Sequence, residues 1–265
     1  LGGAGGAIGA QKVARAPADG YTLLLGSNNE IVINRLITPS TVKYSYKDFT
    51  PIGLVASQPM VLVAAPGTGV KDVDQFVRKV KAAPGRFSFG SSGVGTSLHL
   101  AGEMVKQQAG LFMTHIPYRG VAPLASDLIG GSLEYGVFVL SSGLPHIRSG
   151  KMVALGVTDR RRTQAAPDIP ALAEHPALKG IDIGVWFALM APPKLPEPVA
   201  ARLRRALQEV LQTPEFRKRM EDAGATLAAP DVNMDRLLVD ETAKVQRIDD
   251  IGGPDTHTNF PHGWA

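Results

Sequence analysis

Glycine and hydroxyl residues are concentrated in one stretch, the glycine-serine loop of residues 90–97, which reads Gly-Ser-Ser-Gly-Val-Gly-Thr-Ser. Phe87 and Phe89 before it alternate with polar neighbours, the period-two pattern of a short strand. Beyond it apolar residues recur at helical spacing as far as Gly110, a residue suited to end a helix. Thr96 or Ser97 is placed to cap that helix. Since helix starts carry unpaired N–H donors and a partial positive charge, this stretch predicts an anion-binding site.

Two motifs that the loop fails to match narrow the kind of anion. The loop fits the phosphate-binding pattern G-x-x-x-x-G-K-S except that Thr96 stands in the lysine position, so nucleotide hydrolysis is not expected. It also fails the nucleophile pattern G-x-S-x-G, whose last glycine falls on Val94. An uncharged loop of hydroxyls and amides suits a carboxylate that must bind and leave. The alternative is an ordinary strand–helix turn without a ligand.

Composition excludes several classes of protein. The 265 residues, 44% hydrophobic and 20% charged, suffice for one large or two modest domains. Cysteine is absent and the six histidines lack metal-ligand spacing, so we expect neither a metal nor a cofactor. The net charge is +4, and the basic run 160–162 is interpreted as a solvated loop rather than a nucleic-acid contact. No apolar run is long enough to cross a bilayer, and residues 1–10 lack the basic start of a signal peptide.

A second polar group, Ser27 and Asn28, follows the buried strand expected over residues 21–25. Because ligands in open α/β sheets bind at the carboxyl ends of strands, both residues are candidate ligand contacts, with a plain surface loop as the alternative. The glycine run 2–9 lacks the dinucleotide fingerprint, since Ile8 occupies its third glycine position and no strand precedes it.

Strands and helices alternate along the rest of the chain, which predicts an α/β fold with a mainly parallel sheet. From Gly252 onward no period is visible, and a mobile or loosely docked tail is expected. Further strands are expected over residues 52–65 (with a break at 57–59), 135–140, 152–158 and 181–190, and helices over 70–83, 122–129, 141–148, 196–211, 214–223 and 232–248.

Several short motifs occur in order along residues 2–250, and together they closely resemble the Bug-type, or tripartite tricarboxylate transporter, extracytoplasmic solute-binding proteins. The motifs that carry the resemblance are G-A-G-G-x-I-G-A at 3–10, A-D-G-Y-T-L-L at 18–24, D-F-T-P-I-G at 48–53, F-G-S-S-G-x-G at 89–95, P-Y-R-G at 117–120, D-L-I-G-G at 127–131, L-P-H-I-R-S-G-K at 144–151 and A-P-P at 191–193.

The resemblance implies a fold similar to type II periplasmic binding proteins, with a ligand cleft between two α/β lobes. Residues 1–65 and 188–265 would form the first lobe, and residues 66–187 the second. The family's first strand and helix have no counterpart here, so the resemblance implies that a segment is missing before Leu1. The family's usual aspartate after a valine is replaced at Leu133-Glu134, which leaves ligand specificity open.

The resemblance also implies a function: a periplasmic protein, without enzymatic activity, that binds a small di- or tricarboxylate or an aromatic acid. It would deliver this ligand to the membrane subunits of the transporter. The resemblance places the carboxylate on the glycine-serine loop, at Ser91, Ser92, Gly93, Gly95, Thr96 and Ser97.

Three more residues are candidates at this site. His99 lies just inside the expected helix, and Tyr118 and Arg119 follow a strand. An arginine there can pair with a ligand, but it can equally hold the turn through backbone bonds, and His99 can be a packed polar residue. An α/β enzyme acting on a small anion remains the alternative function, although each catalytic motif fails at a defining position.

Overall fold

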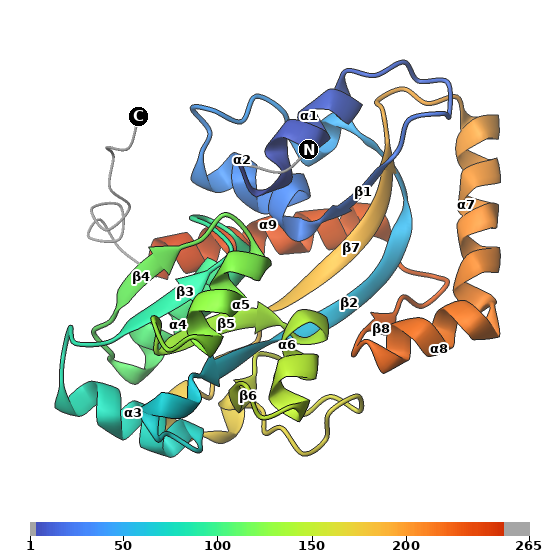
Figure 1. The fold of residues 1–265 in the computed structure, drawn as a ribbon. Coiled ribbons are helices and arrows are strands. Elements are labelled where there is room, and N and C mark those ends of the chain that lie inside the picture. Colours follow the sequence, from blue (N-terminus) through green and yellow to red (C-terminus); the bar gives the residue numbers. More distant parts are fainter. Residues whose placement is uncertain (1–3, 252–265) are drawn as a thin grey trace.

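One long strand, β2 (Thr50–Ala64), is shared by two sheets in the computed structural model, which describes residues 4–251. Residues 50–59 of β2 pair with β7 (Gly184–Ala191), whereas residues 60–64 pair with β5 (Tyr135–Val139). The strand order is β1-β7-β2-β5-β3-β4, and β6 and β8 pair with β2 as well. Figure 1 shows β2 and β7 running side by side across the molecule. The strands therefore form one connected ladder that passes through β2.

The first sheet is antiparallel throughout. It contains β1 (Leu24–Ser27), β7, residues 50–59 of β2, and the short β8 (Thr226–Leu227). The elements around it are α1 (Ala7–Ala14), a π-helical turn (Asn29–Ile33), α2 (Asn34–Ile37), α7 (Glu197–Gln212), α8 (Pro214–Asp222) and α9 (Met234–Ile251).

The second sheet is mixed. Strands β3 (Ser88–Ser91) and β4 (Thr114–Pro117) run parallel to each other, β3 also runs parallel to β5, and β5 and β6 (Val153–Val157) are both antiparallel to β2. The helices of this half are α3 (Val73–Ala82), α4 (Ser97–Ala109), α5 (Val121–Ile129) and α6 (Leu140–Arg148).

The α/β class is confirmed, but the expectation of a mainly parallel sheet is wrong. Strands β3, β4, β5 and β6 do share one direction, as strand–helix alternation predicts. However, β2 lies between β5 and β6 and runs the opposite way, and β1, β7 and β8 add further antiparallel pairs. Alternation along the chain gives the direction of a strand and not the identity of its neighbour.

Two local expectations are corrected as well. Strand β2 is unbroken at residues 57–59, where Pro59 pairs with Gly184 within the ladder. Strand β1 begins at Leu24 rather than at Tyr21, which is 93% exposed, and Leu25 is 64% exposed. This strand pairs only with β7 in the described ladder, so its other edge has no partner strand among the described residues. The tail expected after Gly252 lies outside the described residues.

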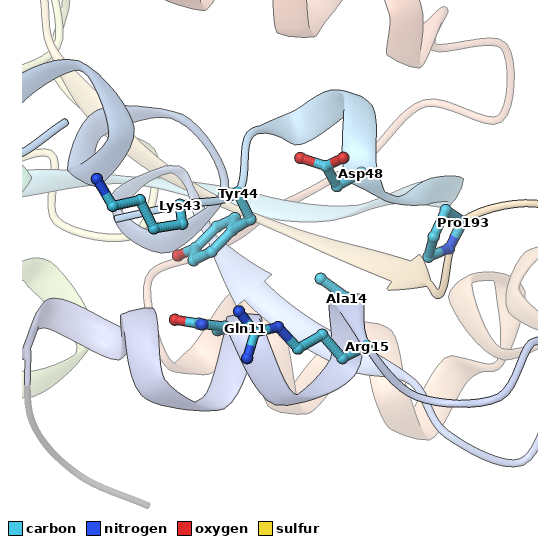
Figure 2. A pocket seen from close by; sticks show the side chains of 7 residues that line it. All are labelled: Gln11, Ala14, Arg15, Lys43, Tyr44, Asp48 and Pro193. Carbon is cyan, nitrogen blue, oxygen red and sulfur yellow. The ribbon is translucent and has the colours of Figure 1, made fainter. Parts of the chain in front are cut away.

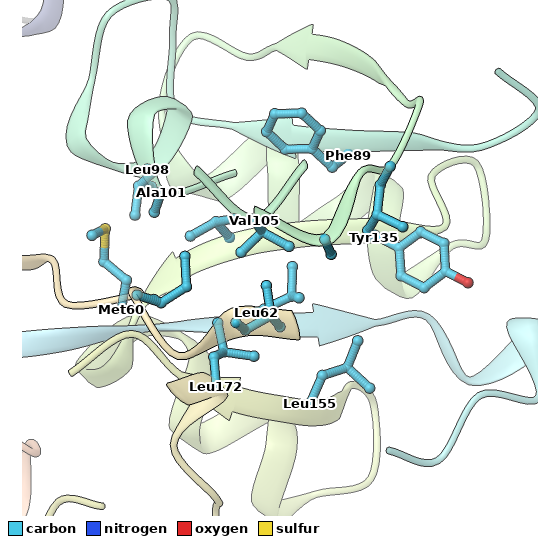
Figure 3. Close-up of a cluster of buried hydrophobic side chains, with 14 of the residues drawn as sticks. Met60, Leu62, Phe89, Leu98, Ala101, Val105, Tyr135, Leu155 and Leu172 are labelled. Carbon is cyan, nitrogen blue, oxygen red and sulfur yellow. The ribbon is translucent and has the colours of Figure 1, made fainter. Parts of the chain in front are cut away.

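Helix α4 packs directly on strand β3, and this contact holds the glycine-serine loop in place. A Cβ atom added to Gly102 in α4 would lie 2.0 Å from Cε2 of Phe89, so only glycine allows this approach. Phe89 and Leu98 belong to one buried cluster with Tyr135 and Val105 (Figure 3). The short distance between helix and strand thus depends on one missing side chain.

The two sheets meet at Thr158, which is 1% exposed. Its Oγ1 accepts the N–H of Met60 at 2.9 Å and donates to the carbonyl oxygen of Ile183 at 2.5 Å. These bonds join the point where β2 changes partners to the segment that enters β7. The assignment of residues 1–65 and 188–265 to one lobe and 66–187 to the other stays a prediction.

Candidate functional site

The glycine-serine loop connects β3 to α4, as the sequence predicts. Thr96 is the N-cap: its hydroxyl accepts the N–H of His99 at 3.4 Å and donates to the carbonyl oxygen of Gly93 at 2.9 Å. Gly110 ends the helix with a left-handed backbone, φ 61°. Gly95 also has a positive φ of 74°, and a Cβ atom added to it would lie 3.0 Å from Ile37 of α2. Helix α2 therefore covers the loop closely.

Three of the loop amides already have acceptors in the loop or in α4. The N–H of Gly93 donates to Ser91 Oγ at 3.2 Å, and the N–H of Gly95 donates to His99 Nδ1 at 3.0 Å. Thr96 donates its N–H to the carbonyl oxygen of Gly93 at 3.4 Å. These bonds define the shape of the loop, so the three amides contribute to an anion site through its geometry rather than as direct donors.

Ser97, the first residue of α4, differs from its neighbours. Its N–H donates at 2.8 Å to Oδ1 of Asn29, a residue 68 positions earlier in the chain. Its hydroxyl is buried, the residue being 1% exposed, and has no partner among the described residues. Ser92, half-buried beside it, makes one long contact, from its Oγ to Thr96 Oγ1 at 3.4 Å. The hydroxyls of Ser97 and Ser92 are thus donors at this helix start that can still turn to a ligand.

Asn29 was not among the residues predicted from the sequence. The available signal was its position: it follows Asn28 at the end of β1, where the strand-end rule already pointed. Its partner could not be read from the sequence, because the contact joins residues 68 positions apart.

Two stacked histidines lie beneath the loop. The rings of His99 and His115 are 3.8 Å apart between centroids and 14° from parallel, and Phe89 lies 5.0 Å from His115. His115 Nε2 is 2.6 Å from Ser91 Oγ, and His99 Nε2 is 3.5 Å from Glu103. Because His99 Nδ1 accepts the Gly95 N–H, its proton is on Nε2, which faces the Glu103 carboxylate.

Burial, followed by the neighbouring His99, lowers the pKa of His115 to about 3. Burial alone would raise the pKa of Glu103, but hydrogen bonds from His99 and Lys106 outweigh it and lower that pKa. His115 is therefore neutral near pH 7, and Glu103 is charged. The pair supports the loop through Ser91 and Gly95.

Ser27 and Asn28 are engaged with other protein groups. The N–H and Oγ of Ser27 both donate to the carboxylate of Glu30, at 2.8 and 2.7 Å, and burial raises the pKa of Glu30 although these bonds oppose it. The amide nitrogen of Asn28 donates to Gly184 and Glu241 at 3.1 and 3.0 Å, and its Oδ1 is buried with no partner in the part of the chain described. Their role as ligand contacts stays a prediction.

Tyr118 and Arg119 follow β4 next to the loop. The Tyr118 N–H donates to the carbonyl oxygen of Ser91 at 3.0 Å, and its hydroxyl donates to Asp127 at 2.8 Å. Desolvation and this carboxylate raise the pKa of Tyr118 to about 12, so the hydroxyl stays protonated. Arg119 is exposed. The structure thus brings His99, Tyr118 and the loop residues together and leaves the part of Arg119 in ligand binding a prediction.

Two cavities lie elsewhere. One, of about 170 Å³, is lined by residues within 11–15 and 43–48, among them Arg15, Tyr44 and Asp48, and by Pro193 (Figure 2). The other, of about 340 Å³, includes Lys79, Phe87 and other residues of the second half. None of the predicted site residues lines either cavity. Ile37 and Asn29 lie against the loop instead.

The described residues contain no group of three or more histidine, aspartate or glutamate side chains arranged to hold a metal ion. None of the helices in the same part of the chain combines the length and apolarity needed to cross a bilayer.

The family model of the tripartite tricarboxylate transporter family receptor matches residues 2–252. The chain belongs to this family. The match extends over both sheets and includes β3, the glycine-serine loop and α4, so the resemblance noted in the motifs is confirmed along nearly the whole chain.

Solved structures agree with this assignment. The periplasmic binding protein BugD superimposes with a TM-score of 0.81 at 32% identity, covering 95% of this chain and 83% of BugD. An R. palustris protein solved with adipate gives 0.89 at 28% identity, covering 95% and 84%. MatC from Rhodopseudomonas palustris with bound malate gives 0.84 at 28% identity, covering 93% and 85%. The family receptor thus has the periplasmic-binding-protein fold predicted from its motifs.

Proposed function

We propose that this family receptor is a periplasmic solute-binding protein that captures a small carboxylate, most simply a dicarboxylate, at the start of α4. It does not transform this ligand. It delivers it to the membrane subunits of a tripartite tricarboxylate-type transporter. The observation that carries the proposal is Ser97, whose buried hydroxyl lacks a partner among the described residues at a helix start shaped by the glycine-serine loop.

The physical argument for an anion rests on the cost of a buried polar group. A buried hydroxyl without a hydrogen bond is unfavourable by roughly 1–3 kcal/mol, and a carboxylate oxygen relieves this cost. The α4 N-terminus adds its partial positive charge. Charge-assisted hydrogen bonds contribute about 1.5–3 kcal/mol each, so a few of them reach the roughly 8 kcal/mol of micromolar affinity.

The solved relatives favour a dicarboxylate, because one carries adipate and another malate. The geometry of Ser91 and His115 argues against catalysis, although they form a hydroxyl–imidazole pair at 2.6 Å. Ser91 is fully buried, and its Oγ also accepts the Gly93 N–H and donates to the Gly93 carbonyl oxygen, so this hydroxyl is committed to the loop. The pair is part of the support of the site.

Calorimetry on the purified chain tests the proposal. Malate, adipate, a tricarboxylate and a monocarboxylate are titrated into the wild type and the double variant Ser92→Ala, Ser97→Ala. We expect at least one of these carboxylates to bind, and the double variant to bind it at least tenfold more weakly, since two hydroxyl donors are removed. Thr96 is left intact because its hydroxyl caps α4.

The matched control is Ser126→Ala, which removes a serine hydroxyl on exposed α5 that bonds the Ala122 carbonyl oxygen. It should bind like the wild type. Equal affinity of wild type and double variant, with unchanged circular dichroism, would show that the loop is only a turn. Turnover of a bound carboxylate would contradict the proposed role in transport.

A further inference from the structure

We propose that Asn29 holds the ligand-carboxylate position at the start of α4 and must be displaced for binding, so that this residue sets the affinity of the site. The inference rests on the proposed function of the same site. It concerns Asn29, which the sequence did not indicate, and a competition between this side chain and the ligand for the Ser97 N–H.

Asn29 contacts the first residue of α4 directly. Asn29 Oδ1 accepts the Ser97 N–H at 2.8 Å. A side-chain carbonyl oxygen on a helix N-terminal N–H is the geometry that a carboxylate oxygen adopts at such a site. The Asn29 carboxamide therefore occupies the place that the proposed function assigns to the ligand.

Three other loop amides already have acceptors. The N–H groups of Gly93, Gly95 and Thr96 are bonded within the second half of the molecule, to Ser91, His99 and Gly93. The Ser97 N–H is bonded instead to a residue outside the loop, from the π-helical turn that follows β1. A carboxylate that binds the buried Ser97 hydroxyl meets Asn29 at the neighbouring N–H.

The two competing acceptors, the Asn29 carboxamide oxygen and the ligand carboxylate oxygen, differ in strength. A carboxamide is neutral, and a carboxylate forms charge-assisted hydrogen bonds that are about twice as strong. Asn29 is only half-buried, and the Ser97 N–H is the partner that fixes its Oδ1. A ligand carboxylate thus displaces Asn29, and its apparent affinity is reduced by the fraction of molecules in which Asn29 holds the position.

The test compares Asn29→Ala with Asn29→Asp by calorimetry, using malate and adipate. Removing the competitor should tighten binding about fivefold, the worth of one net hydrogen bond. Replacing it with a charged competitor should weaken binding at least tenfold. The direction of the alanine effect decides, since an added charge repels an anion from any nearby position. Exchange of the Ser97 N–H with solvent should also become faster in Asn29→Ala.

Asn233→Ala is the matched control, because Asn233 Oδ1 also accepts a helix-start N–H, that of Arg236 at 3.0 Å, far along the chain. It should leave the affinity unchanged. Weaker or equal binding by Asn29→Ala, with the wild type binding normally, overturns this inference and leaves the proposed function standing. If Asn29→Ala binds a carboxylate and the wild type does not, the inference is supported. If neither Asn29→Ala nor the wild type binds, the inference and the proposed function are both overturned.

Discussion

Two stacked histidine rings hold the glycine-serine loop through hydrogen bonds to it. His99 and His115 stack at 3.8 Å, one bonded to the Gly95 N–H and the other to Ser91. Two imidazolium rings at that distance repel each other strongly, and His115 is half-buried as well. The sequence pointed to His99 as a candidate contact or a packed polar residue; its side chain is buried and accepts the Gly95 N–H, and its role as a ligand contact stays a prediction.

His115 should make the protein less stable in acid. Its folded pKa, about 3, lies below the unfolded value of 6.5, so the unfolded chain takes up a proton as the pH falls below about 6.5 and the folded chain does not. The stability is full above pH 6.5 and is lost toward pH 3. In His115→Gln this loss disappears, so between pH 7.5 and 4.5 the wild type should lose about 2–3 kcal/mol more than the variant.

Urea unfolding at several pH values measures this difference. The readout is how steeply the free energy of unfolding changes with pH in each protein. Absolute stabilities are not compared, because His115→Gln also removes the ring stack and lowers stability at every pH. Asp159 serves as an internal check. Burial raises its pKa to about 6, so its contribution to the pH dependence of stability has the opposite sign to that of His115. This contribution is the same in the wild type and in His115→Gln. Parallel pH profiles would mean that His115 takes up a proton in the folded protein as readily as in the unfolded one.

At the scale of elements, the sequence predicted what neighbouring residues decide and missed what distant residues decide. The strand before the loop, the Thr96 cap and the Gly110 end follow from local steric and hydrogen-bonding rules, and all three are confirmed. The position of β2 between β5 and β6 depends on long-range pairing, as does the contact of Asn29 with Ser97. Periodicity carries no information about either.

The close contact of α4 with β3 gives a prediction at this scale. Gly102→Ala places a Cβ atom against the Phe89 ring, whose neighbour His115 limits its movement. Overpacking costs about 1–3 kcal/mol and outweighs the roughly 1 kcal/mol by which alanine favours a helix. Urea unfolding should therefore show a less stable variant.

Gly9→Ala in α1 is the matched control, because an added Cβ atom meets nothing within 4 Å there. The same substitution should then stabilise the protein, by about 0.5–1 kcal/mol. A stabilised Gly102→Ala variant would mean that α4 shifts away from β3 without cost.

At the scale of the whole molecule, the lobe boundary remains to be tested. Strand β2 runs from the first sheet into the second, β7 pairs beside its first part, and Thr158 joins the two strands at the point where β2 changes partners (Figure 1). Two adjacent crossing strands bend most easily about one axis, so we expect the lobes to move as rigid bodies when a ligand binds.

Spin labels can measure this movement, because the chain has no cysteine of its own. Arg205→Cys in α7 and Lys151→Cys after α6 label the two predicted lobes at exposed positions. Their distance distribution should shift on addition of a bound dicarboxylate. The pair Lys81→Cys and Lys151→Cys, both within residues 66–187, should stay constant. A change within that pair, or none between the lobes despite binding, would contradict the boundary.

The shared strand also has a consequence for the order of events during synthesis. Strand β1 and the first part of β2 pair with β7, which is made about 160 residues after β1. At 5–20 residues per second the ribosome needs roughly ten to thirty seconds to supply this partner. Meanwhile residues 60–157 can already form most of the second sheet. The middle of the chain thus acquires its partners first, and the apolar N-terminal strands must wait unpaired for theirs.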